Sequence, residues 1–308
     1  MSPLILHHYP PSPVSEKIRT ALGLKQLSWR SVEQNRLPER PELLAMTGGY
    51  RRIPVLQIGA DIYCDTQLIF RELERRQPTP SLFPDGDSGL PFALSRWTDT
   101  ALFECCVKMA FAPAADSLPA ELVADRARLY LGPTGDFKKE FDDLPHIVAQ
   151  FKPQMAWLEA RLKKGEKFIH GDQAGMSDLL AWYVVWFVKG RYPEADSLFE
   201  DFPAINTWTE YMQAIGHGQP SEMSSAEALE LAKSTIPEAP GTSESNDAQG
   251  IKPGMSVSVA ALGDSGESPV TGTVRCVTLQ SITLDIRNEL CGDVAVHFPR
   301  VGYRVSID

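Results

Sequence analysis

The stretch YPPSPVSEKIR at positions 9–19 joins two elements whose order decides the fold of the first part of the chain. It follows a short apolar run at residues 4–6, which predicts a buried strand, and its second half predicts a helix. This order places Ser12 near a helix N-terminus, where unpaired backbone N–H groups and the helix dipole favour anions. A sulfur anion is one candidate for this place.

Alternating strand and helix signals extend from this stretch through residues 1–78, in the order β-α-β-α-β-β-α. Period-two alternation and short apolar runs predict the strands, and three-to-four-residue spacing predicts the helices. The Gly-Ala-Asp sequence at 59–61 predicts a hairpin between the last two strands. The expected strands are residues 4–6, 28–32, 53–58 and 62–63, and the expected helices are residues 15–24, 41–45 and 65–76.

The chain changes character after a polar stretch at 85–89, and the following 150 or so residues carry helical apolar spacing. A capping-box pattern, Ser-Ser-Ala-Glu at 224–227, opens the last short helix before residue 236. The earlier helices are expected at residues 97–107, 121–130, 147–162, 179–188 and 208–215.

Residues 237–250 are rich in Pro, Gly, Ser and Glu, which predicts a flexible linker. Beyond it, short alternating runs separated by turn residues predict a small all-β barrel. The most distinctive of these runs, VHFPRVGY at 296–303, is a candidate binding spot or plain surface decoration. The expected strands are residues 255–261, 271–279, 282–286, 294–298 and 303–307. The domains expected are thus α/β at 1–78, an all-α bundle at 88–236, the linker at 237–250 and the β unit at 251–308.

The composition and charge of the chain indicate which classes of binding partner are expected. A chain of 308 residues with 43% hydrophobic residues buries a sizeable core, and its net charge of −10 argues against nucleic acid or an anionic membrane surface as the main partner. No apolar run reaches the roughly 18 residues that suggest a membrane span, and no signal-peptide pattern is seen. The five cysteines form neither Cys-x-x-Cys nor a metal-like cluster, so we expect reduced thiols, a cytoplasmic location and no metal.

Four motifs, taken in order, resemble the cytosolic glutathione transferase family over residues 1–236. They are Ser-Pro-Val-Ser at 12–15, Arg-Ile-Pro at 52–54, Asp-Thr at 65–66 and the segment from Phe168 to Leu179. The resemblance implies a thioredoxin-like domain followed by a helical domain. It also implies a homodimer, glutathione as co-substrate and a role in detoxification. Transferases of this family do not usually carry the additional β unit.

The resemblance assigns the thiol chemistry to Ser12, because the related turn in thioredoxin-like proteins holds Cys-Pro-x-Cys. In serine-type members, this hydroxyl donates a hydrogen bond to the glutathione sulfur and lowers the pKa of the thiol. Tyr9 is the rival donor, since other classes use a tyrosine just after the first strand. The alternative without chemistry is that Ser12 and Ser15 cap the helix. A serine at position 12 also disfavours a reductase that works by disulfide exchange.

The second and third motifs imply a glutathione-binding surface. In the family, the bond before Pro54 is cis, and the backbone of Ile53 meets the cysteinyl part of glutathione. Arg52 stands where a basic residue often lies near the glycyl carboxylate. Thr66 and the helix N-terminus suit the γ-glutamyl carboxylate, and Asp65 suits its ammonium group. Ordinary alternatives are an edge-strand proline, a solvated arginine and helix caps.

The fourth motif concerns folding. Asp178 is expected to cap a buried helix, although Gly175 stands where the family usually has Ser or Thr, so the reciprocal side-chain bond is lost. Ser177 is an alternative cap.

The function implied is transfer of the glutathione thiolate to a hydrophobic electrophile. The alternatives are a glutathione-dependent isomerase and a non-catalytic scaffold that acts through the β unit.

Overall fold

The computed structural model describes residues 2–263 and 266–307 and separates into two compact units. Unit 1 comprises Met1–Ser15, Ser28–Leu73 and Gln219–Asp308, and unit 2 comprises Glu16–Leu27 and Glu74–Gly218. Contacts therefore group the chain differently from the boundaries expected from sequence, because the predicted α/β and small β regions share unit 1. The domain boundaries themselves stay predictions.

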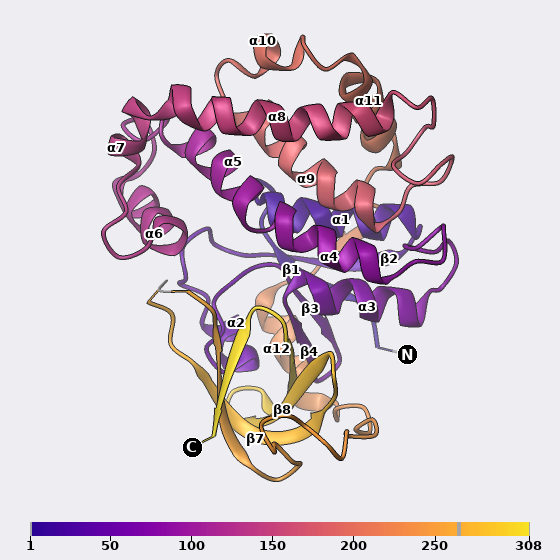
Figure 1. Ribbon diagram of the computed structural model, residues 1–308. Helices are drawn as coiled ribbons and strands as arrows, with labels where there is room; N and C mark the ends of the chain where they lie inside the picture. Colours follow the sequence, from indigo (N-terminus) through magenta and orange to yellow (C-terminus); the bar gives the residue numbers. More distant parts are fainter. Residues whose placement is uncertain (1, 264–265, 308) are drawn as a thin grey trace. The chain divides into compact units, whose positions relative to one another are not determined.

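The element order β-α-β-α-β-β-α is confirmed in the first part of the chain, as a thioredoxin-like fold requires (Figure 1). Pro13 and Pro41 each open a helix, where a missing N–H costs nothing. Gly48 ends the second helix in the left-handed region, at φ 67°. The elements are β1 (Ile5–His8), α1 (Pro13–Leu24), β2 (Ser28–Glu33), α2 (Pro41–Thr47), β3 (Val55–Ile58), β4 (Asp61–Cys64) and α3 (Thr66–Arg76).

Strand β1 lies between β2, to which it is parallel, and β3, to which it is antiparallel, and β3 pairs antiparallel with β4. A short strand that the sequence did not predict, β5 (Gln219–Glu222), extends the sheet beyond β2. All four residues of β5 are exposed, so they lack the apolar alternation by which strands are recognised.

The five strands expected near the C-terminus are confirmed as β6 (Ser256–Ala261), β7 (Val270–Val277), β8 (Ser281–Asn288), β9 (Gly292–Pro299) and β10 (Tyr303–Ile307). They pair antiparallel in the order β10-β6-β7-β8-β9. Strand β9 then pairs in parallel with β4, through Ala295–His297 and Asp61–Tyr63. The small β region is therefore continuous with the thioredoxin-like sheet, and the whole forms one sheet of ten strands.

The hydrophobic core of unit 1 is likewise shared. One cluster joins residues of α2, β3 and β4 to residues of all five C-terminal strands. Tyr50 packs edge-on against Phe298, with 5.7 Å between ring centroids. A Cβ atom placed on Gly48 would lie 2.5 Å from the Ile286 side chain of β8, so the end of α2 approaches the C-terminal strands closely.

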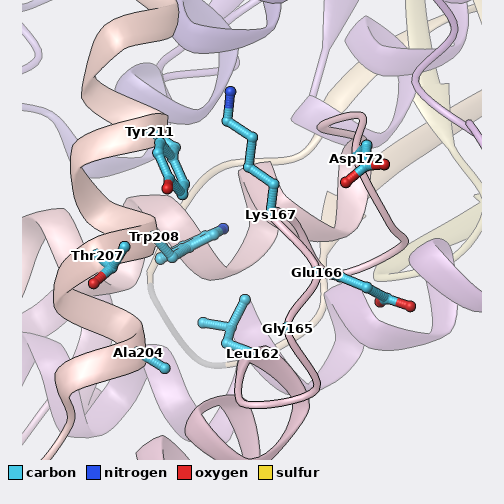
Figure 2. A pocket seen from close by; sticks show the side chains of 9 residues that line it. All are labelled: Leu162, Gly165, Glu166, Lys167, Asp172, Ala204, Thr207, Trp208 and Tyr211. Atoms are coloured by element: carbon cyan, nitrogen blue, oxygen red, sulfur yellow. The ribbon is translucent and has the colours of Figure 1, made fainter.

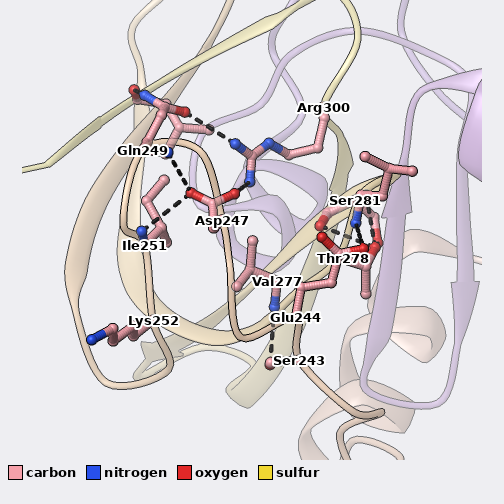
Figure 3. Close-up of polar contacts among 12 residues, drawn as sticks. Ser243, Glu244, Asp247, Gln249, Ile251, Lys252, Val277, Thr278, Ser281 and Arg300 are labelled. Atoms are coloured by element: carbon pink, nitrogen blue, oxygen red, sulfur yellow. Dashed lines mark hydrogen bonds and ion pairs between the residues drawn. The ribbon is translucent and has the colours of Figure 1, made fainter.

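The segment 237–250 forms no helix or strand within the described chain, but several of its residues are bonded to the rest of unit 1, and Figure 3 shows such contacts of Ser243, Asp247 and Gln249. The Glu238 N–H donates to Asp61, and the Glu244 N–H donates to the Val277 carbonyl. Asp247 forms an ion pair of 2.7 Å with Arg300. The segment expected to be a flexible linker therefore lies against the sheet.

Unit 2 is helical (Figure 1). Besides most of α1 and the end of α3, its helices are α4 (Gly89–Thr98), α5 (Ala101–Phe111), α6 (Ala120–Leu131), α7 (Phe137–Asp142), α8 (Leu144–Leu162), α9 (Met176–Arg191), α10 (Ala195–Phe199) and α11 (Pro203–Ile215). The single helix expected over 97–107 is instead two, α4 and α5, which meet at Asp99–Thr100. The last helix, α12 (Ser225–Ser234), has the predicted capping box but belongs to unit 1, so it lies outside the helical unit.

Asp178, at the start of α9, holds three segments of unit 2 together. Its carboxylate accepts hydrogen bonds from the Gly175 N–H at 3.0 Å, the Ile169 N–H at 2.9 Å and the Trp208 indole at 2.9 Å. A Cβ on Gly175 would lie 2.9 Å from the Leu82 carbonyl, which explains glycine at this cap.

Ser177 does not act as the alternative cap, because its hydroxyl is bonded to the ring of His170.

Across the described residues, no helix combines the length and the apolar character needed to cross a bilayer.

Candidate functional site

The register of the sheet brings the predicted site segments to one end of unit 1. His7 pairs with Val55, and Val55 pairs with Cys64, so these residues form one row across β1, β3 and β4. Because β3 is antiparallel to both neighbours, the row lies near the end of β1, at the start of β3 and at the end of β4. The residues just beyond this row form the candidate site: Tyr9, Ser12, Ile53, Pro54, Asp65 and Thr66.

Ser12 occupies the position before α1, and its Oγ accepts a hydrogen bond of 3.1 Å from the Ser15 N–H. This is the geometry of a helix cap, so Ser12 caps α1, as the alternative without chemistry predicted. The bond uses a lone pair and leaves the hydroxyl hydrogen to be donated elsewhere. The Oγ of Ser15 is buried and has no hydrogen-bond partner within the described chain. Capping and ligand binding are therefore compatible at Ser12.

Tyr9 lies in the same turn and is partly buried. Its carbonyl accepts a hydrogen bond of 3.1 Å from the Ser12 N–H, which fixes the turn. The two rival donors are thus three residues apart in one turn. This geometry does not choose between them, so both remain candidates for the donor to the ligand.

The bond between Ile53 and Pro54 is cis, as the resemblance implied. Pro54 is buried and directly precedes β3, while Ile53 is partly exposed. The predicted backbone feature is therefore present at the start of β3.

Asp65 connects β4 to α3 and adopts the left-handed region, at φ 74°, which is uncommon for a residue with a side chain. Its Oδ1 accepts from the Gln67 N–H at 2.9 Å, so Asp65 caps α3. Its Oδ2 accepts from the Tyr303 hydroxyl at 3.1 Å, and that hydroxyl is 3.1 Å from the hydroxyl of Tyr50. Burial, with nearby Tyr50 and Asp65, raises the pKa of Tyr303 well above its usual value, so its hydroxyl stays protonated.

Arg52 is bound to a carboxylate of the chain itself. Its Nε lies 3.0 and 2.9 Å from the two carboxylate oxygens of Glu267, and its Nη2 also donates to Glu267. Burial lowers the pKa of Arg52, but the hydrogen bonds to Glu267 and the nearby Glu267, Tyr50 and Tyr303 side chains together raise it above its usual value. Glu267 lies between β6 and β7, so the β region reaches both Arg52 and Asp65.

The direction of β9 explains why the β region reaches this place. Because β9 runs parallel to β4, both strands end at the same end of the sheet, and the turn after β9 leads to Tyr303. In the same turn, the Val301 carbonyl accepts a hydrogen bond from the Gln67 side chain. Tyr303 falls in the distinctive stretch 296–303, which was predicted to be either a binding spot or surface decoration and was not assigned to the site. Nothing in the sequence pattern singled out Glu267.

Burial keeps the thiol beside the candidate site protonated. The five cysteines are free thiols, and burial raises the pKa of Cys64 beside the site well above its usual value. Within the described ranges, no group of three or more His, Cys, Asp or Glu side chains is placed to hold a metal.

A separate pocket of about 370 Å³ lies within unit 2, between the end of α8 and α11 (Figure 2). Lys167 lies over the Tyr211 ring, with its Nζ 4.8 Å from the ring centroid. Glu166 and Asp172 are also in the lining, so the pocket carries charges of both signs. None of the predicted site residues lines it.

Comparison with known proteins adds to this geometry. A sequence profile described as "Glutathione S-transferase, N-terminal domain" matches residues 6–81, and one described as "Glutathione S-transferase, C-terminal domain" matches residues 123–210. No curated protein sequence matches the chain.

The crystal structure of a GST-like protein from Pseudomonas syringae is similar over 100% of both chains, with 35% identity and a TM-score of 0.81. Glutathione transferase F7 from Populus trichocarpa covers 68% of this chain and 93% of its own, with 17% identity and a TM-score of 0.52. A glutathione S-transferase-I bound with lactoylglutathione covers 70% and 98%, with 19% identity and a TM-score of 0.51. The last two comparisons support the fold alone, whereas the first extends through the C-terminal strands.

Proposed function

Because the chain belongs to the glutathione S-transferase family, we propose that it binds glutathione at the candidate site and transfers the thiolate to a hydrophobic electrophile. The observation that carries this proposal is the row of His7, Val55 and Cys64. This row brings the turn of Ser12, the cis bond before Pro54 and the start of α3 to one end of the sheet. A tripeptide with two carboxylates and a thiol fits such a set of backbone and hydroxyl groups.

In the proposed complex, Ser12 donates its hydroxyl hydrogen to the glutathione sulfur. The α1 N-terminus adds a positive partial charge, and both effects favour thiolate over thiol. The thiolate then attacks the electrophile and forms a carbon–sulfur bond, either as a leaving group departs with its electron pair or by addition to an activated double bond whose other end takes up a proton. Ser12 thus activates a nucleophile that belongs to the ligand.

The remaining contacts hold the peptide. The backbone of Ile53 pairs with the cysteinyl unit, and Thr66 with the first turn of α3 receives the γ-glutamyl carboxylate. Asp65, held by Tyr303 and by the Gln67 N–H, is positioned for the ammonium group. Arg52 is assigned to the glycyl end of the ligand.

The test is binding to immobilised glutathione together with turnover of an activated aryl halide. Ser12→Ala should lower kcat by at least about tenfold, which is the minimum that loss of a charge-assisted hydrogen bond predicts. Ser306→Ala, in an exposed position of β10, is the matched control and should behave as the wild type. Loss of activity in Tyr9→Phe, with Ser12→Ala unchanged, would transfer the role to Tyr9.

A non-catalytic scaffold is the second candidate, and a specific observation favours it. The β region binds both Arg52 and Asp65, so part of the ligand-binding surface is engaged by the chain itself. A protein that binds glutathione but turns over no electrophile would support this alternative. The serine-type turn also resembles glutathione-dependent isomerases, and conversion of a cis-enone without net loss of glutathione would identify that activity.

The resemblance also leads us to propose a homodimer, a cytoplasmic location and a role in detoxification. Light scattering of the purified protein tests the dimer, because two chains of 34.1 kDa would give about twice that mass. Fractionation of cells tests the location.

A further inference from the structure

Glu267 is bonded to Arg52 in a way that resembles the recognition of a ligand carboxylate. Both of its oxygens face the guanidinium group, through Nε and Nη2. The Glu267 side chain is only 10% exposed and that of Arg52 is 35% exposed. The pair is therefore mostly withdrawn from solvent, where a charge-assisted bidentate contact is stronger than at the surface.

This contact matters because a guanidinium group offers a limited set of donors in a fixed plane. The edge formed by Nε and Nη2 accommodates one carboxylate, and Glu267 already occupies it. A ligand carboxylate at the same place could not hydrogen-bond to that edge of the guanidinium group, and the negative charge of Glu267 would repel it. A neutral ester or amide at the same place meets neither obstacle.

We infer that Glu267 is a specificity-determining residue that fills the carboxylate place at Arg52 from within the chain. The site then prefers glutathione derivatives whose glycyl carboxylate is masked as an ester or amide over glutathione itself. This inference rests on the proposed function, since it assumes that Arg52 faces the glycyl end of the ligand. The β region accordingly takes part in ligand selection.

The experiment compares the dissociation constants of glutathione and its glycyl monoethyl ester, measured by calorimetry on the full-length chain. The wild type should bind the ester about tenfold more tightly than the free acid. Glu267→Gln keeps the shape of the side chain but removes its charge, so the preference for the ester should fall by about tenfold, the size of one charged hydrogen bond, and the variant should bind the two ligands about equally. Glu289→Gln is the matched control, because Glu289 is an exposed glutamate of the same β region and is not a partner of Arg52.

Two other outcomes overturn the inference in different ways. If all three proteins bind both ligands with the same ratio, glutathione binding stands and the role of Glu267 is refuted. If none binds either ligand, the proposed function fails and the inference fails with it. Circular dichroism checks the fold of each variant, and Glu267→Ser provides a second neutral substitution if Glu267→Gln does not fold.

Discussion

His7 should make the protein sensitive to mild acid. It is fully buried in β1, where its Nε2 lies 2.8 Å from the Gln57 side-chain oxygen and its Nδ1 lies 3.2 Å from the amide nitrogen of Gln34. The Gln34 amide donates to Nδ1, so this pattern fits a neutral ring that carries its hydrogen on Nε2. Burial lowers the pKa of His7 from 6.5 to about 4, although the bond to Gln57 acts in the opposite direction.

The size of the effect follows from linkage. Between pH 6.5 and about 4, the unfolded chain binds a proton at His7 that the folded chain does not, so the free energy of unfolding falls as the pH falls. At pH 5, the loss is about 2 kcal/mol relative to pH 7.5, and it approaches roughly 3 kcal/mol below pH 4.

Urea unfolding at pH 7.5 and pH 5, followed by circular dichroism, measures this loss. His7→Asn removes the titrating group, so its own stability should change by about 2 kcal/mol less between the two pH values than that of the wild type. His146→Asn, at an exposed position of α8, should keep the wild-type change. The reasoning is refuted if His7→Asn and the wild type lose the same stability between pH 7.5 and pH 5.

Three further substitutions test the packing. Asp178→Ala leaves three buried donors without an acceptor, so it should lower the free energy of unfolding in urea by about 3 kcal/mol or more. Asp172→Ala, at an exposed neighbouring position, should lower it little, and equal losses in the two variants would contradict this prediction. Phe298→Ala should lower the free energy of unfolding by about 3–5 kcal/mol, and hydrogen exchange should show that β1–β4 lose protection together with β6–β10. Val301→Ala, at an exposed position, should have neither effect. Loss of protection in β6–β10 alone would argue against a shared core. Gly48→Ala should lower the melting temperature, because its positive φ and the nearby Ile286 together disfavour a Cβ by about 1–2 kcal/mol, and an unchanged value would count against that close approach.

Local sequence patterns predicted most helices and strands of the fold. These patterns arise because buried residues recur at regular intervals along each helix or strand. The strands β6–β10 follow period-two alternation, and α12 has a capping box formed by two residues three positions apart in sequence. The pattern could not reveal which strands meet. The pairing of β9 with β4 joins residues more than 200 positions apart, and neither strand differs locally from one at a sheet edge.

The candidate site could likewise be predicted where its residues have a local sequence pattern, but not where they are brought in by the fold. The turn of Ser12 and the residues around Pro54 and Asp65 have local signatures, and the register of the sheet brings them to one end. Glu267 has no such signature, because an isolated glutamate in a polar loop is usually solvated. Its importance comes only from the fold, which places it at Arg52.

The parallel pairing of β9 with β4 also bears on solubility. An open strand edge presents unpaired N–H and C=O groups that promote aggregation between chains. Strand β9 covers that edge of β4, and the free edges of the sheet become β5 and β10. Strand β5 has only four residues and includes Pro220, so it offers a poor template for another strand. A chain that ended before β6 would expose β4, with apolar Ile62 in it, and should self-associate.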